Sequence, residues 1–388
     1  MAPQRPELEP AVFEARNTGS MGVVTNVPFV DLVRLHAPLK GEFAAAFERV
    51  LASGRYHLGP ETKALEAEFA EHEGSSRGIA CGSGSDALYL AMRALDIGPG
   101  DAVVTVSNSF LATAESIGRT GATTLFAEPD PATRCMDPAD LARVLNEPGA
   151  DRIKAVIPVH LYGHPADIAG IRTALSNAGR DDVFVIGDAA QAHGSPGVGG
   201  LTDITCYSFY PAKNLGALGD GGMVLCKDEA TEKRVRSLRN HGRGSKHDSV
   251  ELGLNSRFDE IQAAVLRIKL RRLREWNDQR RDVAMRYGKR LAELETLTLP
   301  QDHPDHVYHL YVVEADDREA RIADLESRGL GIGRHYPVPT HSMTPYPSSR
   351  ALPVTERQCA RNFSLPMFPG MVDREIDAVC TAVHAVFG

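Results

Sequence analysis

The sequence lacks the features of a membrane protein, a secreted protein or a nucleic-acid-binding protein. No apolar run approaches the roughly 18 residues that a transmembrane helix needs, and we expect no signal peptide at the N-terminus. The 388 residues carry a net charge of −8, and no basic run is long enough to offset it. This balance argues against a nucleic-acid groove. The most basic stretch, residues 269–281, is better explained as the solvated face of a helix.

Cysteine pairs and metal-ligand clusters are also missing. The six cysteines are scattered, without a CxxC pair or a His/Cys cluster of metal-binding spacing. We therefore expect buried thiols in a reducing compartment, a cytoplasmic protein and no bound metal. No internal repeat or low-complexity segment is present. What remains is an ordinary globular composition, 43% hydrophobic and 24% charged, in a chain long enough for about two domains.

Expected strands and helices alternate along most of the chain. The strands are expected at residues 78–81, 102–106, 123–127, 154–160, 183–186, 204–210 and 306–313. The helices are expected at residues 40–52, 61–72, 82–95, 138–145, 168–178, 229–238, 259–273, 276–294, 318–328 and 373–387. This alternation predicts an α/β fold with a doubly wound, mostly parallel sheet, which binds ligands at the C-terminal ends of its strands.

The composition and the pattern also suggest a division of the chain. Residues 1–26 are rich in Pro, Glu, Ala and Asn without a clear period, and we expect a flexible extension with no catalytic role. Residues 27–275 would form the large ligand-binding domain. Residues 276–388 would form a smaller C-terminal domain, entered through the helix at 276–294.

The stretch from Ile186 to Gly222 contains one lysine in an unusual setting. One apolar run leads to Asp188, and a second run, residues 204–210, precedes Lys213, which is followed by several glycines. A lysine after a strand is usually a solvated loop residue. Here the glycines let a ligand approach the backbone, and Ser208 offers a hydroxyl for a phosphate. A desolvated lysine amine in such a place can act as a Schiff-base nucleophile.

A second candidate site lies where a Gly/Ser turn opens a strong helix at G-S-G-S-D-A, residues 82–87. The free N–H groups and the dipole of a helix N-terminus favour an anion. A dinucleotide fingerprint is one interpretation, but the third glycine of GxGxxG is missing and no acid clearly closes a strand about 20 residues on. The other interpretation is a phosphate cup in which Gly84 and Ser85 supply the donors.

The pairing of D-A-A-Q (Asp188 to Gln191) with S-F-Y-P-A-K-N (Ser208 to Asn214) resembles the pyridoxal-phosphate sugar aminotransferases of the DegT branch of fold-type I enzymes. The resemblance extends from Val27 to near the C-terminus. It implies a large domain with a mostly parallel sheet, a smaller C-terminal α+β domain, and pyridoxal 5′-phosphate as cofactor. Lys213 would hold the cofactor aldehyde, Asp188 would pair with its pyridine nitrogen, and Gln191 would bind its phenolic oxygen.

The resemblance also assigns residues around the ring and the phosphate. Gly84, Ser85 and Ser208 would hold the phosphate, and Phe110 would stack on the ring, although it could instead be an ordinary core residue. Asn255, in L-G-L-N-S-R, would reach the phosphate of a partner subunit, which implies a homodimer with shared active sites. The alternative for Asn255 is a polar cap before the helix at 259–273.

Four residues fall where the family places groups that face the substrate. They are His309, Arg334, His335 and Tyr336. Their segments look closest to family members that act at C3 of a dTDP-linked 3-keto-6-deoxyhexose in amino-sugar or antibiotic-sugar biosynthesis. Related branches aminate C4 or another cyclic ketone such as an inosose. Val106 and Asn108 depart from the family pattern P-S-F-T-F, which leaves the identity of the substrate open.

The implied reaction moves an amino group from glutamate to a keto-sugar nucleotide. Two other classes of protein stay open. A nicotinamide-dependent oxidoreductase is disfavoured by the incomplete glycine fingerprint. A sensor of pyridoxal phosphate or of a sugar nucleotide, built on the same scaffold without catalysis, is disfavoured by the intact set of Lys213, Asp188 and Gln191.

Overall fold

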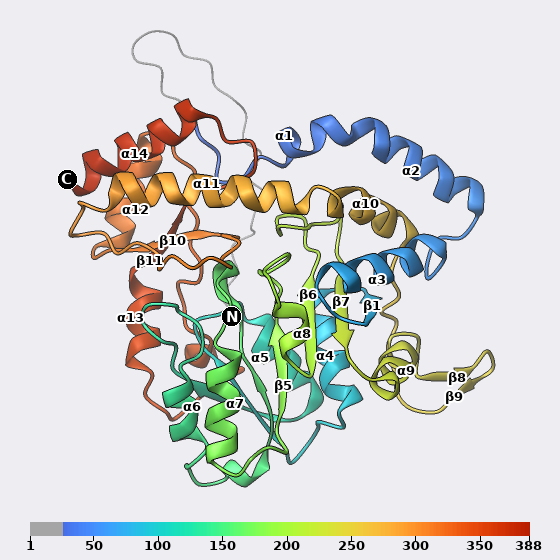
Figure 1. Cartoon of the computed structure of the whole chain (residues 1–388). Coiled ribbons are helices and arrows are strands. Elements are labelled where there is room, and N and C mark those ends of the chain that lie inside the picture. The colour runs from blue at the N-terminus through green and yellow to red at the C-terminus, as the bar shows by residue number, and fades with distance from the viewer. Residues whose placement is uncertain (1–25) are drawn as a thin grey trace, which may run out of the picture.

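The computed structural model describes residues 26–388, so the extension expected at residues 1–26 lies outside the described residues except for its last position. Most of the chain surrounds one seven-stranded sheet (Figure 1). Its strands are β1 (Arg77–Cys81), β2 (Ala102–Val106), β3 (Thr123–Ala127), β4 (Ile153–Ile157), β5 (Phe184–Asp188), β6 (Ile204–Ser208) and β7 (Gly222–Cys226). The helices of this part are α3 (Pro60–His72), α4 (Gly84–Ala94), α5 (Ala112–Thr120), α6 (Pro138–Val144), α7 (Ile168–Asn177), α8 (Val198–Leu201), α9 (Glu229–Leu238) and α10 (Glu260–Leu270).

The strand order β1-β7-β6-β5-β4-β2-β3 is that of a doubly wound sheet. Strands β2 to β6 pair in parallel, whereas β7 runs antiparallel to both β1 and β6. The predicted α/β fold with a mostly parallel sheet is therefore confirmed. Because the parallel strands share one direction, the residues that follow β5 and β6 meet at the same edge of the sheet.

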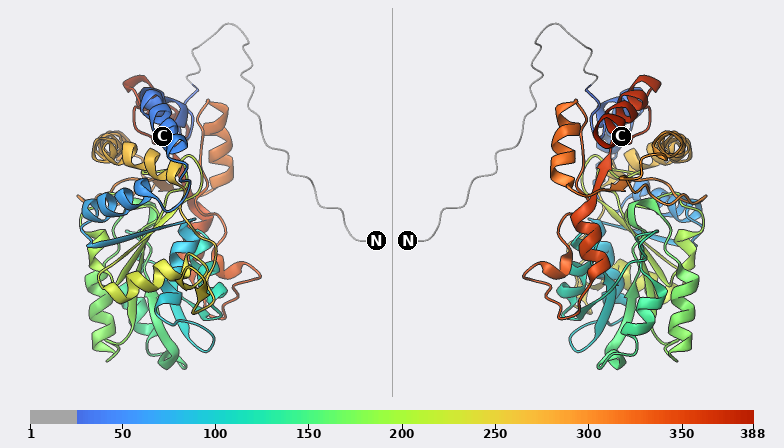
Figure 2. Two further views of the ribbon diagram at one scale, coloured as in Figure 1. Left: turned by 90° about the vertical axis from the view of Figure 1, so that its right-hand side faces the viewer. Right: turned by 90° about the vertical axis from the view of Figure 1, so that its left-hand side faces the viewer.

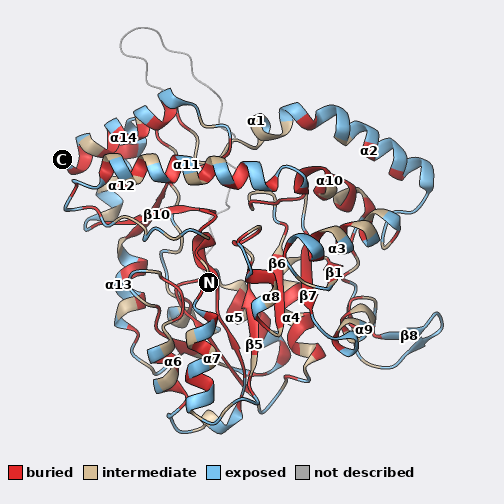
Figure 3. Cartoon of the chain, viewed as in Figure 1, coloured by how far each residue is buried: buried red, intermediate tan, exposed pale blue. Residues whose placement is uncertain are grey.

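Successive residues of each strand face opposite sides of the sheet, and helices cover both sides (Figure 2). On one side, Ile157 and Ile186 pack with residues of α4, α5 and α9. On the other side, Val156 and Val185 pack with α6 and α7, and Tyr207 packs with α3 and α10. The strands are consequently buried along most of their length (Figure 3).

A second, smaller core forms around α11 (Leu273–Leu291), α12 (Arg318–Ser327), α14 (Asp373–Phe387) and the antiparallel pair β10 (Tyr311–Glu314) and β11 (Asn362–Leu365). α11 runs from α10 across the large sheet towards α12 and α14 (Figure 1). Val27 also packs in this core, so the first described residues lie against the C-terminal part. The division at residues 275 and 276 stays a prediction.

The remaining elements connect these two parts or project from them. They are α1 (Leu32–His36), η1 (Ala37–Leu39), α2 (Lys40–Ser53), η2 (Ala150–Arg152), η3 (Leu161–Gly163), β8 (Arg243–Ser245), β9 (Asp248–Ser249), η4 (Thr340–Ser342) and α13 (Pro353–Arg361). α13 returns to the large part, where the side chain of Glu128 accepts hydrogen bonds from the N–H groups of Val354 and Thr355. No helix within residues 26–388 is both long and apolar enough to cross a membrane.

Two expectations from the sequence need correction. The strand expected at 306–313 begins only at Tyr311, because Tyr308 has a positive φ of 42° and breaks the extended backbone. The basic stretch 269–281 is a solvated face only in part. Lys269 and Arg280 are 1% and 3% exposed, since they point from α10 and α11 into the protein, whereas Arg274 is exposed.

Candidate active site

A cavity of about 530 Å³ opens at the C-terminal ends of β5 and β6 and extends to the 309–310, 335–336 and 367 segments of the C-terminal part. Ten of the twelve residues predicted for the site line this cavity. They are Gly84, Ser85, Phe110, Asp188, Gln191, Ser208, Lys213, His309, His335 and Tyr336. Asn255 and Arg334 do not line it.

Asp188 is the last residue of β5 and is 5% exposed. The hydroxyl of Thr113 donates to its Oδ2 at 2.7 Å, and the N–H of Ala190 donates to its Oδ1 at 3.1 Å. Burial raises the pKa of this carboxyl above 3.8, while the two donors and the nearby Lys213 ammonium act in the opposite direction. A cationic group placed in the cavity would favour the ionised form of Asp188.

Lys213 follows β6 in a turn in which its own N–H donates to the carbonyl oxygen of Tyr210 at 2.9 Å. Its side chain is partly buried and makes no hydrogen bond or ion pair with another residue of the described range 26–388. Loss of solvation lowers the pKa of the Lys213 amine from 10.5 to about 8, and the charge of Asp188 partly opposes this shift. A substantial fraction of the amine is therefore neutral, and so nucleophilic, near pH 8.

We predict that the rate at which Lys213 captures added pyridoxal phosphate rises with pH and levels off above about pH 8. The rise follows the neutral fraction of the amine. Asp188→Asn removes a charge that raises the pKa of Lys213, so the midpoint should move to lower pH. Stopped-flow absorbance across pH 6–10 measures both midpoints. The matched control is Asp182→Asn, in the exposed turn before β5. An equal shift of the pH midpoint in this control would contradict the prediction.

The expected phosphate cup lies between the N-terminus of α4 and the end of β6. Ser83 caps α4 by accepting the N–H of Asp86 at 3.1 Å, which leaves the N–H groups of Gly84 and Ser85 without an acceptor among the described residues. A Cβ on residue 84 would lie 2.6 Å from the Cβ of Ser208, so only glycine lets the helix approach β6 this closely. Free N–H groups, a helix dipole and the Ser208 hydroxyl together suit an anion.

The cup is held in place from the loop before α10. The hydroxyl of Ser256 accepts the N–H of Gly82 at 2.9 Å and donates to the Asp86 carboxylate at 2.8 Å. Asn255, directly before it, is exposed and is not among the residues that line the cavity.

Gly84→Ala should weaken binding of pyridoxal phosphate by roughly 5- to 100-fold, the range that corresponds to overpacking by one methyl group at a rigid contact. Fluorescence titration of the cofactor into the apo protein measures the change. Gly41→Ala is the matched control, because a Cβ at this exposed position of α2 meets no atom within 4 Å. Unchanged affinity in Gly84→Ala would show that the helix and β6 can separate without loss of the cup.

Gln191 connects the sheet edge to the C-terminal part. Its Oε1 accepts the backbone N–H of Tyr162 at 2.7 Å, and its Nε2 donates to the hydroxyl of Tyr336 at 3.1 Å. The phenol of Tyr162 in turn donates to the carbonyl oxygen of His335 at 2.7 Å. These contacts fix the side chain of Gln191 and place Tyr336 directly beside it.

Two histidines of the cavity are neutral at physiological pH. Burial and the charges of Lys213 and Arg280 hold the pKa of His309 well below its usual range, and its Nδ1 lies 3.2 Å from the Oδ1 of Asn214. Burial lowers the pKa of His335 to about 4, and its Nδ1 lies 2.9 Å from the hydroxyl of Ser364. Neutral rings in these positions can hydrogen-bond a substrate without adding charge.

Of the two remaining predicted residues, Phe110 lines the cavity and Arg334 does not. Phe110 is 51% exposed and tilts against Tyr336 with 5.7 Å between ring centroids, which excludes ordinary core packing. Arg334 lies outside the cavity, where its guanidinium pairs with Glu319 at 3.1 Å and Glu326 at 3.4 Å on α12. A direct contact between Arg334 and a ligand in this cavity is therefore not supported by the geometry.

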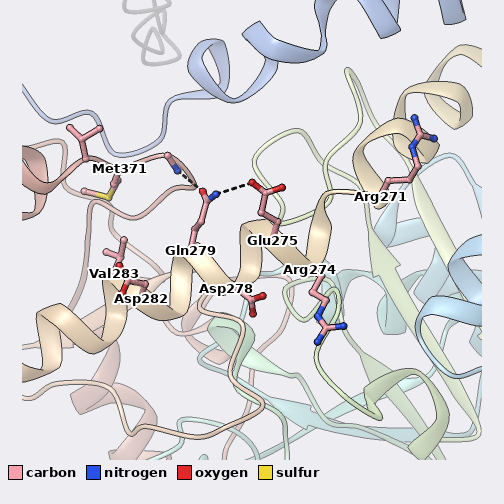
Figure 4. Close-up of a pocket in the computed structure, with 10 residues that line it drawn as sticks. Arg271, Arg274, Glu275, Asp278, Gln279, Asp282, Val283 and Met371 are labelled. Atoms are coloured by element: carbon pink, nitrogen blue, oxygen red, sulfur yellow. Dashed lines mark hydrogen bonds between the residues drawn. The ribbon is translucent and has the colours of Figure 1, made fainter.

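A more open groove of about 830 Å³ runs along α11 and contains none of the predicted residues (Figure 4). Its wall consists mainly of charged, solvated side chains of α11, and Gln279 accepts the N–H of Gly370 there at 2.9 Å. Nothing in it combines buried donors with a nucleophile. The cavity at β5 and β6 is thus the better candidate for chemistry, although it is the smaller of the two.

Sequence reasoning missed the supporting partners of the predicted residues. Thr113 donates to Asp188 from 75 positions away, and the sequence around Thr113 does not indicate this contact. Asn214 was visible as the last residue of the lysine motif. Its side chain donates to Asn277 at 2.9 Å and to the carbonyl oxygen of Val307 at 3.0 Å, which ties the lysine turn to α11.

Comparison with known families gives one match that covers most of the chain. Residues 38–384 match the sequence model of the DegT/DnrJ/EryC1/StrS aminotransferase family. The chain is 40% identical over 368 residues to a UDP-N-acetyl-3-dehydro-alpha-D-glucosamine 3-aminotransferase of Acidithiobacillus ferrooxidans, covering 93% of this chain and 98% of the relative. It is 41% identical over 367 residues to a dTDP-3-amino-3,4,6-trideoxy-alpha-D-glucose transaminase of Streptomyces venezuelae, covering 91% and 95%.

Solved structures with the same fold are also similar in sequence. DesV of S. venezuelae, in complex with a ketimine intermediate, has a TM-score of 0.87 and 39% identity, with 93% of this chain and 98% of DesV covered. NtdA of Bacillus subtilis, with the bound cofactor PMP, has a TM-score of 0.88 and 30% identity, with 94% and 85% covered. The large sheet and the smaller C-terminal part therefore have the arrangement of this group of enzymes.

Proposed function

The chain belongs to the DegT/DnrJ/EryC1/StrS aminotransferase family and is a transaminase, and we propose that it moves an amino group from glutamate to C3 of a dTDP-linked keto-deoxyhexose. The observation that carries the proposal is one cavity with three features: a lysine that has no partner among residues 26–388 and a pKa of about 8, a buried carboxylate and an open anion cup. The S. venezuelae relative supports the dTDP-linked sugar, and both relatives act at C3 by their names.

Pyridoxal phosphate fits the residues that are present. The N-terminus of α4 offers free N–H donors for its phosphate beside Ser208, and Asp188 and Lys213 offer a carboxylate and an amine in the same cavity. When bound, the cofactor supplies an aldehyde that takes up amino groups and a ring that withdraws electrons from the adjacent carbon. Asp188 would hold the ring nitrogen protonated, and Gln191 would donate to the phenolic oxygen.

Each residue then has a defined task. The amine of Lys213 removes the proton from the α-carbon of the amino donor and returns a proton to the sugar carbon in the second half of the reaction. Its pKa near 8 suits both proton transfers, because the protonated and the neutral form of the Lys213 amine are both populated at neutral pH. Phe110 and Tyr336 confine the ring and exclude water, and His309 and His335 contact the substrate as neutral hydrogen-bonding groups.

The proposal includes a homodimer in which Asn255 of one subunit completes the phosphate cup of the other. Its support is that Asn255 is exposed while its neighbour Ser256 holds the cup of its own chain. Sedimentation of the loaded protein measures the state of assembly. A monomer with full activity would refute this part of the proposal.

The test separates the two halves of the reaction. Adding glutamate to the cofactor-loaded protein should abolish its near-visible absorption and release 2-oxoglutarate. A panel of dTDP- and UDP-linked sugars with a ketone at C3 or C4 should then restore the band, and NMR of the product identifies the aminated carbon. Restoration by UDP-linked sugars alone, or amination at C4, would overturn the assigned substrate. A band that glutamate leaves unchanged would overturn the donor.

A further inference from the structure

Arg280 is a buried cation without an acidic partner. It lies on α11, is 3% exposed and forms no ion pair with any described acid. Its Nη1 donates to three carbonyl oxygens, those of Tyr308 at 3.2 Å, His309 at 3.3 Å and Met367 at 3.2 Å. Its Nε is buried without an acceptor, and its Nη2 makes no hydrogen bond within residues 26–388. Burial lowers the pKa of Arg280 to about 10, so the group stays charged at neutral pH.

Arg280 is one of the residues that line the cavity containing Lys213. His309 links the two segments: its carbonyl oxygen accepts from Arg280, and its ring meets Asn214, the residue after Lys213. The charges of Lys213 and Arg280 both lower the pKa of His309, as expected if the two cations face one common space. A buried charge without a counter-ion is unfavourable, and an anion that enters this space would remove the penalty.

We propose that Arg280 binds a carboxylate of the amino donor and thereby fixes the donor's α-carbon beside Lys213. This inference rests on the proposed function and names the group that selects its amino donor. Nη2 is the N–H group left to donate to a carboxylate oxygen, and a charged guanidinium makes that hydrogen bond stronger than a neutral one. A phosphate is the less suitable occupant, because the cup at α4 and Ser208 already offers an anion site at the other side of the cavity.

The experiment is calorimetric titration of the cofactor-loaded protein with glutarate, a dicarboxylate that carries no amino group and cannot react. Arg280→Gln should weaken glutarate binding by roughly 10- to 100-fold, which is the loss of affinity expected when one hydrogen bond to a charged group is removed. Arg281→Gln is the matched control and should bind within about 3-fold of wild type. Arg281 is the next residue of α11, but it pairs with Asp278 and does not line the cavity.

Kinetics give an independent readout. Arg280→Gln should raise the KM for glutamate by a similar factor, while the KM for the keto-sugar nucleotide and the affinity for dTDP stay unchanged. Arg280→Lys keeps the charge but loses the planar group that donates both to the backbone carbonyls and through Nη2, and we expect it to lie between wild type and Arg280→Gln. It also provides the measurement if Arg280→Gln does not fold.

Three results would overturn the inference. In the first, wild type does not bind glutarate. In the second, a folded Arg280 variant binds glutarate as tightly as wild type does. The third is a variant that loses affinity for dTDP instead of affinity for glutarate. Failure of the proposed function is distinguishable from these results. In that case glutarate still binds in an Arg280-dependent manner, but glutamate leaves the absorption of the cofactor unchanged.

Discussion

Lys213→Ala should abolish amino transfer, with kcat lower by at least about 1,000-fold. Lys213 is an amine that lines the cavity, lies partly buried beside Asp188 and has a pKa lowered to about 8. Under the proposed function, alanine removes the one amine that would both hold the cofactor aldehyde and take the proton from the donor. No other lysine of residues 26–388 lines the cavity, so no neighbouring amine of this range can replace it.

Two measurements separate this loss from misfolding. Borohydride reduction followed by peptide mass spectrometry should attach the pyridoxyl group to Lys213 in wild type and to no residue in the variant. Lys227→Ala, an exposed change directly after β7, is the matched control and should retain full turnover. A Lys213→Ala variant that still turns over within about 10-fold of wild type would remove the central claim about this residue.

The positions of Asp188 and Lys213 could be predicted from the sequence because each follows a strand of strong apolar character. Parallel strands bring such ends together at one edge of the sheet, so the pattern that gives the fold also places the site. The positions of Gly84 and Ser85 could also be predicted from the sequence. A Gly/Ser turn after a strand and before a helix produces free N–H groups at the N-terminus of that helix.

Contacts between distant segments could not be predicted in this way. Thr113 reaches Asp188 only because the first turn of α5 lies at the C-terminal end of β5, and Arg280 lines the cavity only because α11 passes beside it. Arg280 was hidden within a basic stretch that resembles a solvated face, and local charge density does not tell which arginine of a helix points inward. Arg334 shows the opposite error. It adjoins His335 and Tyr336 in sequence, yet its side chain turns to α12.

Asp188→Asn should lower kcat by roughly 100- to 10,000-fold while the protein stays folded and keeps its cofactor. The change is nearly isosteric, and the amide oxygen can still accept from Thr113 or from the N–H of Ala190. What it loses is the negative charge, which would hold the ring nitrogen of the cofactor protonated in a buried place. The effect should appear in both half-reactions, because both depend on the same electron-withdrawing ring.

Thr113→Val is the graded comparison, since it leaves the carboxylate but removes its 2.7 Å hydrogen bond. One such bond to a charged group is worth about 1.5–3 kcal/mol, so we expect a loss of roughly 10- to 100-fold, smaller than that of Asp188→Asn. Single-turnover absorbance with glutamate measures both variants. If Thr113→Val costs as much as Asp188→Asn, the orientation of the side chain decides the rate; if neither variant slows the reaction, Asp188 does not act on the cofactor ring.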